Sequence, residues 1–128
     1  MKETNLTITI NKLIQEVFDF CINPKNTPLW IDGILREETN EWPVKVGSIY
    51  RNQNMRNEWS EYVLTEFQPP KLFTMHKKDA HYTVRYTLKP IGDATELNYY
   101  EWMDVGELEE PFTLEILQKL KLAIEQSL

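Results

Sequence analysis

The chain has 128 residues, of which 41% are hydrophobic and 27% charged, and its formal net charge is −6 at pH 7. This length fits one domain, 1–128, and the composition is ordinary for a globular protein. The acidic balance argues against a nucleic-acid partner and against binding to an anionic membrane surface, because both need a basic face.

The beginning of the chain and its cysteine content indicate the compartment. Residues 1–5 contain no apolar core of a signal peptide, and no run approaches the ~20 apolar residues of a membrane span. The single cysteine, Cys21, excludes an internal disulfide and fits a reducing compartment. We therefore expect a cytoplasmic protein without membrane insertion.

The first third of the chain predicts one strand and two short helices. Residues 5–10 alternate apolar and polar side chains, as a half-buried strand does. Residues 12–21 have apolar side chains at helical spacing, and Asn11 before them is a good N-cap. Residues 26–34, which include Pro28, predict a second short helix or turn.

The next seventy residues predict six strands separated by turns. These strands are expected at 35–42, 48–56, 59–67, 72–76, 81–89 and 95–103. The alternation is clearest in 81–89, where Tyr82, Val84 and Tyr86 share one face. The polar and acidic strand 35–42 is expected near an edge of the sheet.

The last stretch, 111–128, predicts a long amphipathic helix that begins with Pro111. Its apolar face consists of Phe112, Ile116, Leu117, Leu120, Ala123, Ile124 and Leu128. No upstream helix of comparable length can receive this face. We therefore predict an α+β fold in which the helix lies across a curved antiparallel sheet of seven strands.

Several segments along nearly the whole chain fit one known pattern in their order and spacing. They are Ile10-Asn11 followed by Val17-Phe18, Pro28-Leu29-Trp30, Val46-Gly47-Ser48-Ile49-Tyr50, residues 63–70 leading into Leu72-Phe73, and residues 86–90 before residues 92–97 and the last helix. In these features the chain resembles the START-type helix-grip superfamily, which includes pollen allergens, polyketide cyclases/dehydrases and lipid-transfer domains. The resemblance implies a seven-stranded sheet that wraps round the last helix, with an internal cavity for a hydrophobic molecule.

The strand faces assigned to the interior define a candidate ligand-binding cavity. Its expected residues are Tyr50, Asn52, Met75, Tyr82, Val84, Tyr86, Leu97, Tyr99, Glu101, Met103, Ile116 and Leu120. Buried tyrosine hydroxyls need hydrogen-bond partners, which a cavity with water or a polar ligand supplies. Plain core packing is the simpler explanation of the same residues, because large side chains on the inner faces of strands usually fill space.

Glu101 is the candidate catalytic residue, because a carboxyl group on a cavity wall can act as acid or base. The alternative is that a bulge turns it to solvent, or that it pairs with Arg51 or Arg85. Arg85 itself is expected on the outer face. Strand faces depend on register, and a shift by one residue reverses them.

The remaining candidate groups predict no metal and no cofactor. His76 and His81 flank an expected turn and have no third ligand of clear geometry. Cys21 lies on the apolar face of its helix without a histidine nearby, as a buried structural cysteine does. There is no Gly-rich phosphate loop and no H-E-x-x-H motif.

Three functions stay open from the sequence. The first is binding of a hydrophobic or amphipathic small molecule, lipid-like or polyketide-like, in the cavity. The second is a cyclase or dehydrase reaction in the same cavity. The third is a co-chaperone-like partner module, for which Tyr62, Leu64, Tyr100 and Trp102 are expected on the opposite faces. A homodimer through an edge strand or these aromatic residues also stays open.

Overall fold

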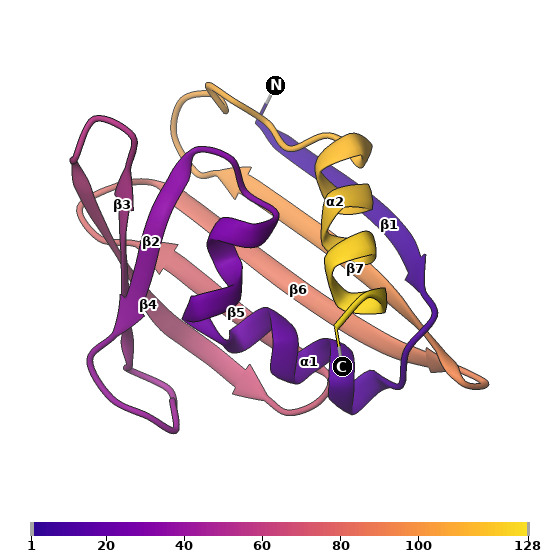
Figure 1. Ribbon diagram of the computed structural model, residues 1–128. Helices are drawn as coiled ribbons and strands as arrows, with labels where there is room; N and C mark the ends of the chain where they lie inside the picture. The colour runs from indigo at the N-terminus through magenta and orange to yellow at the C-terminus, as the bar shows by residue number, and fades with distance from the viewer. Residues whose placement is uncertain (1, 128) are drawn as a thin grey trace.

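A computed structural model describes residues 2–127 and shows one curved sheet with helices on one side (Figure 1). The elements follow in the order β1 (Glu3–Ile10), α1 (Ile14–Ile22), η1 (Pro24–Leu29), β2 (Ile34–Thr39), β3 (Ile49–Asn54), β4 (Trp59–Gln68), β5 (Leu72–Lys77), β6 (Tyr82–Ile91), β7 (Ala94–Met103) and α2 (Leu114–Glu125). Within residues 2–127, no helix is long and apolar enough to cross a membrane.

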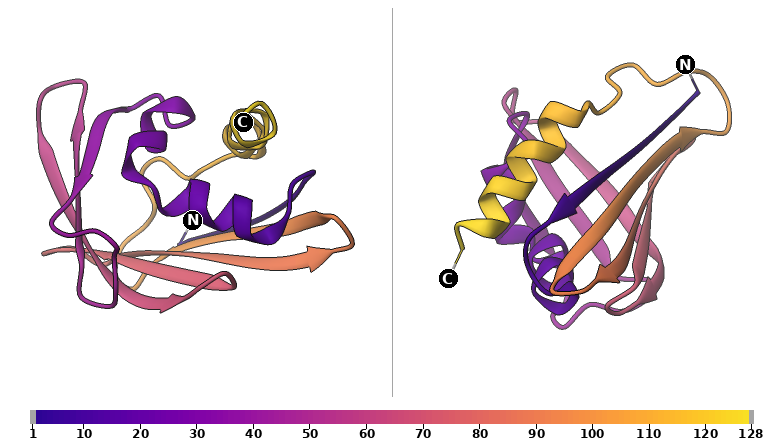
Figure 2. Two further views of the ribbon diagram at one scale, coloured as in Figure 1. Left: turned by 60° about the horizontal axis from the view of Figure 1, so that its bottom comes forward. Right: turned by 90° about the vertical axis from the view of Figure 1, so that its right-hand side faces the viewer.

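The seven strands form one antiparallel sheet in the order β1-β7-β6-β5-β4-β3-β2. The sheet is strongly curved, so that β2 and β3 stand at a steep angle to β6 and β7, and α1, η1 and α2 all lie on the concave side (Figure 2). This arrangement confirms the predicted α+β helix-grip fold, including the edge position of the acidic strand β2.

The last helix is shorter than its apolar pattern predicts. α2 spans the 12 residues Leu114–Glu125, so Pro111 and Phe112 lie before it. Thr113 is the N-cap, and its hydroxyl accepts a hydrogen bond from the Ile116 N–H at 3.4 Å. The prediction of a helix from Pro111 was therefore wrong at this end, and predicted residue 128 lies outside the described residues.

The first helix also begins later than predicted. Leu13 occupies the N-cap position of α1 and makes no capping hydrogen bond with its side chain. The backbone N–H of Asn11 instead donates to Glu125 Oε2 at 2.7 Å. Asn11 is thus part of the contact between the end of β1 and the end of α2, and its predicted role as a cap is wrong.

One strand has its faces reversed relative to the prediction. Tyr62 pairs directly with Tyr50 across β3 and β4, so both side chains point to the concave side. Leu64 follows on the same face and is completely buried. Apolar residues occupy both faces of β4, so the alternation could not determine which face points inward. The expectation that Tyr62 and Leu64 face outward was wrong.

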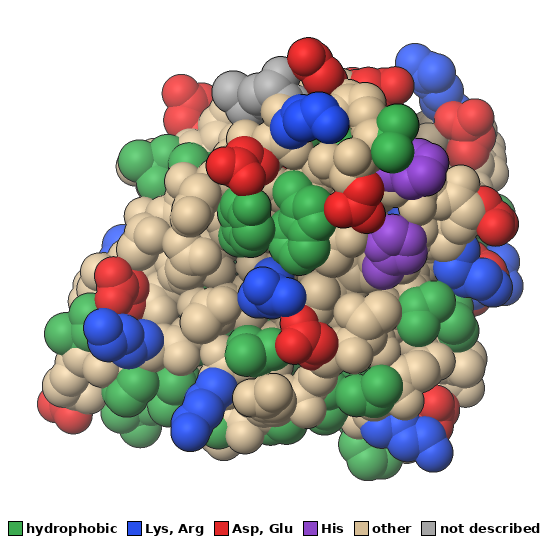
Figure 3. Space-filling view, turned by 180° about the vertical axis from the view of Figure 1, so that it is seen from behind, with side chains coloured by type: hydrophobic (Ala, Val, Ile, Leu, Met, Phe, Trp, Pro, Cys, Tyr) green, Lys and Arg blue, Asp and Glu red, His purple; other side chains and the backbone are tan. Residues whose placement is uncertain are grey.

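The convex face of the sheet carries the other predicted outward residues. The rings of Tyr100 and Trp102 stack at 4.9 Å, and the Arg85 guanidinium lies 5.4 Å from the Trp102 ring. Arg85 also forms an ion pair with Glu66 at 2.7 Å. Figure 3 shows this side of the molecule, where hydrophobic side chains lie in small groups separated by charged and polar ones.

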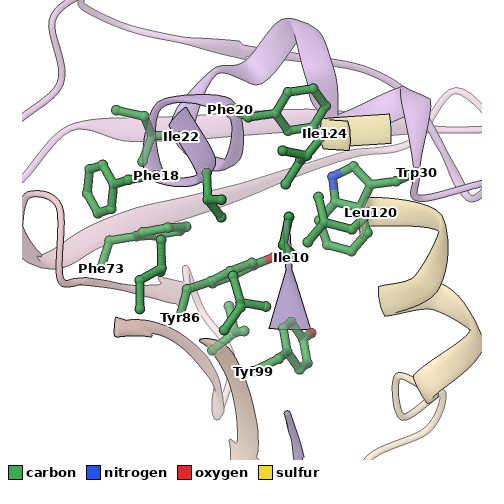
Figure 4. Close-up of a cluster of buried hydrophobic side chains, with 14 of the residues drawn as sticks. Ile10, Phe18, Phe20, Ile22, Trp30, Phe73, Tyr86, Tyr99, Leu120 and Ile124 are labelled. Atoms are coloured by element: carbon green, nitrogen blue, oxygen red, sulfur yellow. The ribbon is translucent and has the colours of Figure 1, made fainter. Parts of the chain in front are cut away.

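The dense part of the core lies where α1 and α2 meet the sheet (Figure 4). Leu117, Leu120 and Ile124 of α2 are buried, and Ile10 at the end of β1 lies beside Leu120 and Ile124. Phe18 of α1 packs edge-on against Phe73 with ring centres 5.6 Å apart. These contacts fix both helices on the concave side.

The Tyr50 hydroxyl joins β3 to the end of α1 by donating to the Ile22 carbonyl at 2.6 Å, and the Tyr50 side chain is 1% exposed. We expect Tyr50→Phe to lower the free energy of unfolding by about 1–3 kcal/mol, because the buried carbonyl loses its donor. Urea denaturation measures this change. Tyr100→Phe removes a hydroxyl that contacts Glu3 on the exposed face, and it should change little. Equal effects of the two variants would contradict the assignment.

Candidate functional site

An internal cavity of about 140 Å³ lies between the concave face of the sheet and the segment that contains α1 and η1. Its lining combines aromatic rings, aliphatic side chains and a few polar groups. The lining residues are Cys21, Thr27, Trp30, Ile31, Ile34, Glu37, Asn52, Tyr62, Phe73, Met75, Tyr82, Val84, Tyr86, Tyr99 and Phe112. None of these described lining residues is Lys, Arg or His.

A chain of aromatic contacts forms one wall of the cavity. The rings of Phe73 and Tyr86 stack at 4.4 Å, Tyr86 meets Tyr99 edge-on at 5.2 Å, and Tyr99 stacks on Phe112 at 4.6 Å. Trp30 packs edge-on against Phe112 at 5.9 Å from the opposite side. These contacts hold the rings in defined positions and give the cavity a rigid apolar wall.

Glu101 is 1% exposed and is the centre of a hydrogen-bond network. Its Oε1 accepts from the hydroxyls of Tyr82 at 2.7 Å and Tyr99 at 3.1 Å, and its Oε2 accepts from the Phe112 N–H at 2.7 Å. Burial of Tyr82 and Tyr99 raises the pKa of both phenols, so they stay protonated and act as donors. Each carboxylate oxygen of Glu101 therefore has a protein donor.

A second, wider pocket at the surface borders the cavity. This outer pocket has a volume of about 400 Å³ and shares Tyr62, Tyr82 and Phe112 with the cavity. Its other lining residues are Lys77, Ala80, Glu101, Met103, Glu107, Leu108, Glu109 and Glu110. The acidic segment between β7 and α2 thus forms a wall of this outer pocket.

Glu37 of β2 is the carboxyl group on the described cavity lining, and the sequence analysis missed it. Its Oε1 accepts from the Thr27 hydroxyl at 2.6 Å and its Oε2 from the Asn52 amide at 3.2 Å. Burial raises the pKa of Glu37, while these two hydrogen bonds oppose the rise. Burial, assisted by the negative charge of Glu37, also raises the pKa of Tyr62 to about 12.

Cys21 lines the cavity from α1 and keeps partial exposure. Burial raises the pKa of its thiol to about 12. The thiol is therefore protonated at neutral pH, and it lacks the thiolate character of a catalytic nucleophile.

The predicted cavity residues fall into three groups in the structure. Asn52, Met75, Tyr82, Val84, Tyr86 and Tyr99 line the cavity, and Glu101 and Met103 line the outer pocket. Tyr50, Leu97 and Leu120 are buried in the core, and Ile116 is partly buried against it. The described residues of α2 contribute nothing to the cavity lining, so the expected position between sheet and last helix is corrected to one beside α1 and η1.

The lining residues that sequence reasoning missed come mainly from residues 21–37 and from Phe112. Thr27, Trp30 and Ile31 lie in or just after η1, whose 3-10 geometry and internal Pro28 give no helical periodicity. The short segment Pro28-Leu29-Trp30 was noted only as part of a family pattern. The polar and acidic pattern of residues 35–42 likewise did not indicate that the Glu37 side chain points inward.

The two histidines lie near the turn between β5 and β6. His76 Nδ1 is 2.9 Å from Thr83 Oγ1, and His81 is exposed. Within residues 2–127, no group of three or more His, Cys, Asp or Glu side chains is arranged to hold a metal ion.

A comparison with protein families identifies the family of the chain. The family model described as polyketide cyclase / dehydrase and lipid transport matches residues 1–128. The chain belongs to this family. No curated protein sequence gives a significant match.

Solved structures agree with the family in fold. Protein CV1439 from Chromobacterium violaceum has a TM-score of 0.74 at 14% identity, with 99% of this chain and 100% of that chain covered. Protein XoxI from Bacillus cereus has a TM-score of 0.73 at 15% identity, covering 98% and 97%. The di-domain ARO/CYC StfQ from the steffimycin biosynthetic pathway has a TM-score of 0.71 at 11% identity, covering 97% of this chain and 50% of that chain. At these low sequence identities, the similarity to the solved structures shows that the fold is shared.

Replacing Glu101 tests its structural role. In Glu101→Gln, the side chain keeps one acceptor oxygen, so it cannot accept from both phenols and from the Phe112 N–H together. We expect the free energy of unfolding to fall by about 1–3 kcal/mol and the Phe112 amide to exchange at least tenfold faster. Hydrogen exchange followed by NMR measures the amide directly. Tyr82→Phe is the matched control, because it removes one phenol and leaves Glu101 Oε2 on Phe112; unchanged exchange in Glu101→Gln would refute this role.

The reactivity of Cys21 reports on the cavity and on its elevated pKa. Because the pKa of the thiol is about 12, the thiolate fraction at pH 8 is far below that of a free cysteine. We expect iodoacetamide to alkylate Cys21 of the folded protein at least a hundredfold more slowly than it alkylates glutathione at pH 8. In denaturant, Cys21 should react at the same rate as glutathione. Mass spectrometry follows the reaction, and fast alkylation of the folded protein would contradict the burial of the thiol.

Proposed function

We propose that the protein binds a hydrophobic or amphipathic small molecule, lipid-like or polyketide-like, in the cavity beside α1 and η1. The observation that carries this proposal is the cavity itself: the interior is not filled by side chains, although the lining is predominantly apolar. Ligand pockets are typically apolar with a few placed polar groups, and Asn52, Glu37 and the tyrosine hydroxyls are such groups here.

The outer pocket supports this proposal by offering a route and additional volume. It shares three lining residues with the cavity, and Phe112 is one of them. A ligand larger than the inner cavity would displace the Phe112 ring and extend into the outer pocket. The hydrogen bond from the Phe112 N–H to Glu101 holds the backbone in place during such a movement.

The energetics of the cavity suit moderate affinity. A ligand that buries on the order of 200 Å² of apolar surface gains roughly 5 kcal/mol from burial. Part of this gain offsets the lost freedom of the ligand. Hydrogen bonds to the polar lining groups then contribute both affinity and orientation.

A second candidate is a cyclase or dehydrase reaction in the same cavity. Glu37 favours it, because a carboxyl group whose pKa is raised by burial is suited to proton transfer. Glu101, the residue chosen from the sequence, is less suited because it accepts three hydrogen bonds from the protein and does not line the inner cavity. The structural neighbour StfQ, described as a di-domain ARO/CYC, is consistent with such chemistry. Recovery of a bound molecule unchanged after long incubation would argue for binding alone.

The partner-module hypothesis receives less support. Its sequence basis was the expected outward position of Tyr62, Leu64, Tyr100 and Trp102, yet Tyr62 and Leu64 face inward. On the convex face, Arg85 packs on Trp102 and pairs with Glu66.

A cavity-filling variant tests the proposed function. Val84 lines the cavity from β6, so Val84→Phe should occupy ligand space and lower the affinity for a retained or added ligand at least tenfold. Native mass spectrometry of the purified protein, followed by thermal-shift titration with lipids and polyketides, measures retention and affinity. Thr87→Phe is the matched control, because Thr87 is exposed on the opposite face of the same strand. Absence of any ligand, or equal binding by both variants, would overturn the proposal.

A further inference from the structure

Glu37 is the acceptor in both of the hydrogen bonds that it makes with Thr27 and Asn52. The Thr27 hydroxyl donates to Oε1 and the Asn52 amide donates to Oε2, so both oxygens act as acceptors toward the protein. Each carboxylate oxygen can accept a second hydrogen bond. A further partner that enters from the cavity would therefore have to be a donor.

Within the described cavity lining, Glu37 is the only carboxyl group and no Lys, Arg or His is present. Glu37 also lines a surface pocket that contains Lys25. The negative charge of Glu37 helps to raise the pKa values of the phenols of Tyr50, Tyr62 and Tyr86. Around the outer pocket, Lys77 is outnumbered by Glu101, Glu107, Glu109 and Glu110. The route to the cavity is thus also predominantly acidic.

A ligand anion would meet an unfavourable environment at this position. Buried charges need a counter-ion or several hydrogen bonds, and a second carboxylate beside Glu37 would find no cation in the described cavity lining. A hydroxyl or a protonated amine would instead complete the acceptor capacity of Glu37. The aliphatic and aromatic side chains of Met75, Val84 and Tyr86 would hold the apolar part of the ligand on β5 and β6.

We infer that Glu37 determines which ligands the cavity binds. It selects apolar molecules that present a hydrogen-bond donor, either an amine or a hydroxyl, to its carboxylate. Apolar carboxylates of the same size are excluded. This inference rests on the proposed function and names its ligand class. A fatty-acid-type anion is thereby excluded, while polyphenol-like and amine-bearing molecules are selected. The polar end of the ligand lies toward η1 and β2.

Four probes with one apolar body test the inference: 2-methylnaphthalene, 2-naphthylmethanol, 2-naphthylmethylamine and 2-naphthoate. Isothermal titration calorimetry with the full chain at pH 7 measures the Kd of each. We expect the alcohol and the amine to bind at least tenfold more tightly than the naphthoate. The affinity of 2-methylnaphthalene should lie between that of the naphthoate and those of the alcohol and the amine. In Glu37→Gln, the affinity for the amine should fall at least fivefold. The difference in affinity between the amine and the naphthoate should become smaller.

Glu38→Gln is the matched control, because it removes the same charge from the neighbouring residue of β2, whose side chain is 56% exposed and paired with Arg51. It should leave the ranking unchanged. The wild-type ranking tests the inference without any variant, so a folding defect in Glu37→Gln does not remove the test.

The outcomes separate the inference from the proposed function. If the naphthoate binds as tightly as the amine and the alcohol, the inference is overturned while ligand binding stands. If the expected ranking persists in Glu37→Gln, Glu37 is not its cause and the inference is equally overturned. If none of the four probes binds, both the inference and the proposed binding of small apolar molecules fail.

Discussion

The buried carboxylate of Glu101 is the constraint on which the site depends. A carboxylate that is 1% exposed must be compensated by donors, and here they come from β6, from β7 and from the segment before α2. The hydrogen bond from the Phe112 N–H to Glu101 anchors this segment to the sheet, where Phe112 stacks on Tyr99. α2 then begins after its N-cap Thr113. The buried carboxylate thus ties the segment before the last helix to the strands that line the cavity.

The same network explains why the two inward carboxyl groups differ in what they can do. Glu101 contributes its acceptor capacity to the tertiary structure, whereas Glu37 has one protein donor on each oxygen and faces the cavity. Burial alone therefore does not identify a functional acid. The number and direction of the hydrogen bonds that a buried carboxylate already makes are the better criterion.

The sequence predicts the architecture well, because strand and helix periods are local signals. The alternation in β6 correctly assigned Tyr82, Val84 and Tyr86 to the interior. It failed in β4, whose two faces are both apolar and whose orientation is set by pairing of Tyr62 with Tyr50. The start of α2 was missed because Phe112 continues the apolar spacing of the helix, although Thr113 is the N-cap and Phe112 precedes it. The cavity walls from η1 and β2 have no period at all, so only the tertiary structure reveals them.

The position of the cavity follows from how the helices cover the sheet. α2 has 12 residues and packs with Leu117, Leu120 and Ile124 toward β1, while the part of the concave face formed by β2 to β5 is covered by the short η1 and by Trp30. Leu117, Leu120 and Ile124 are buried in the first region, and about 140 Å³ stays open in the second. An apolar molecule that enters this space gains roughly 25 cal/mol for each Å² of apolar surface that it buries. The incomplete packing beside η1 is therefore the structural feature on which the proposed binding rests.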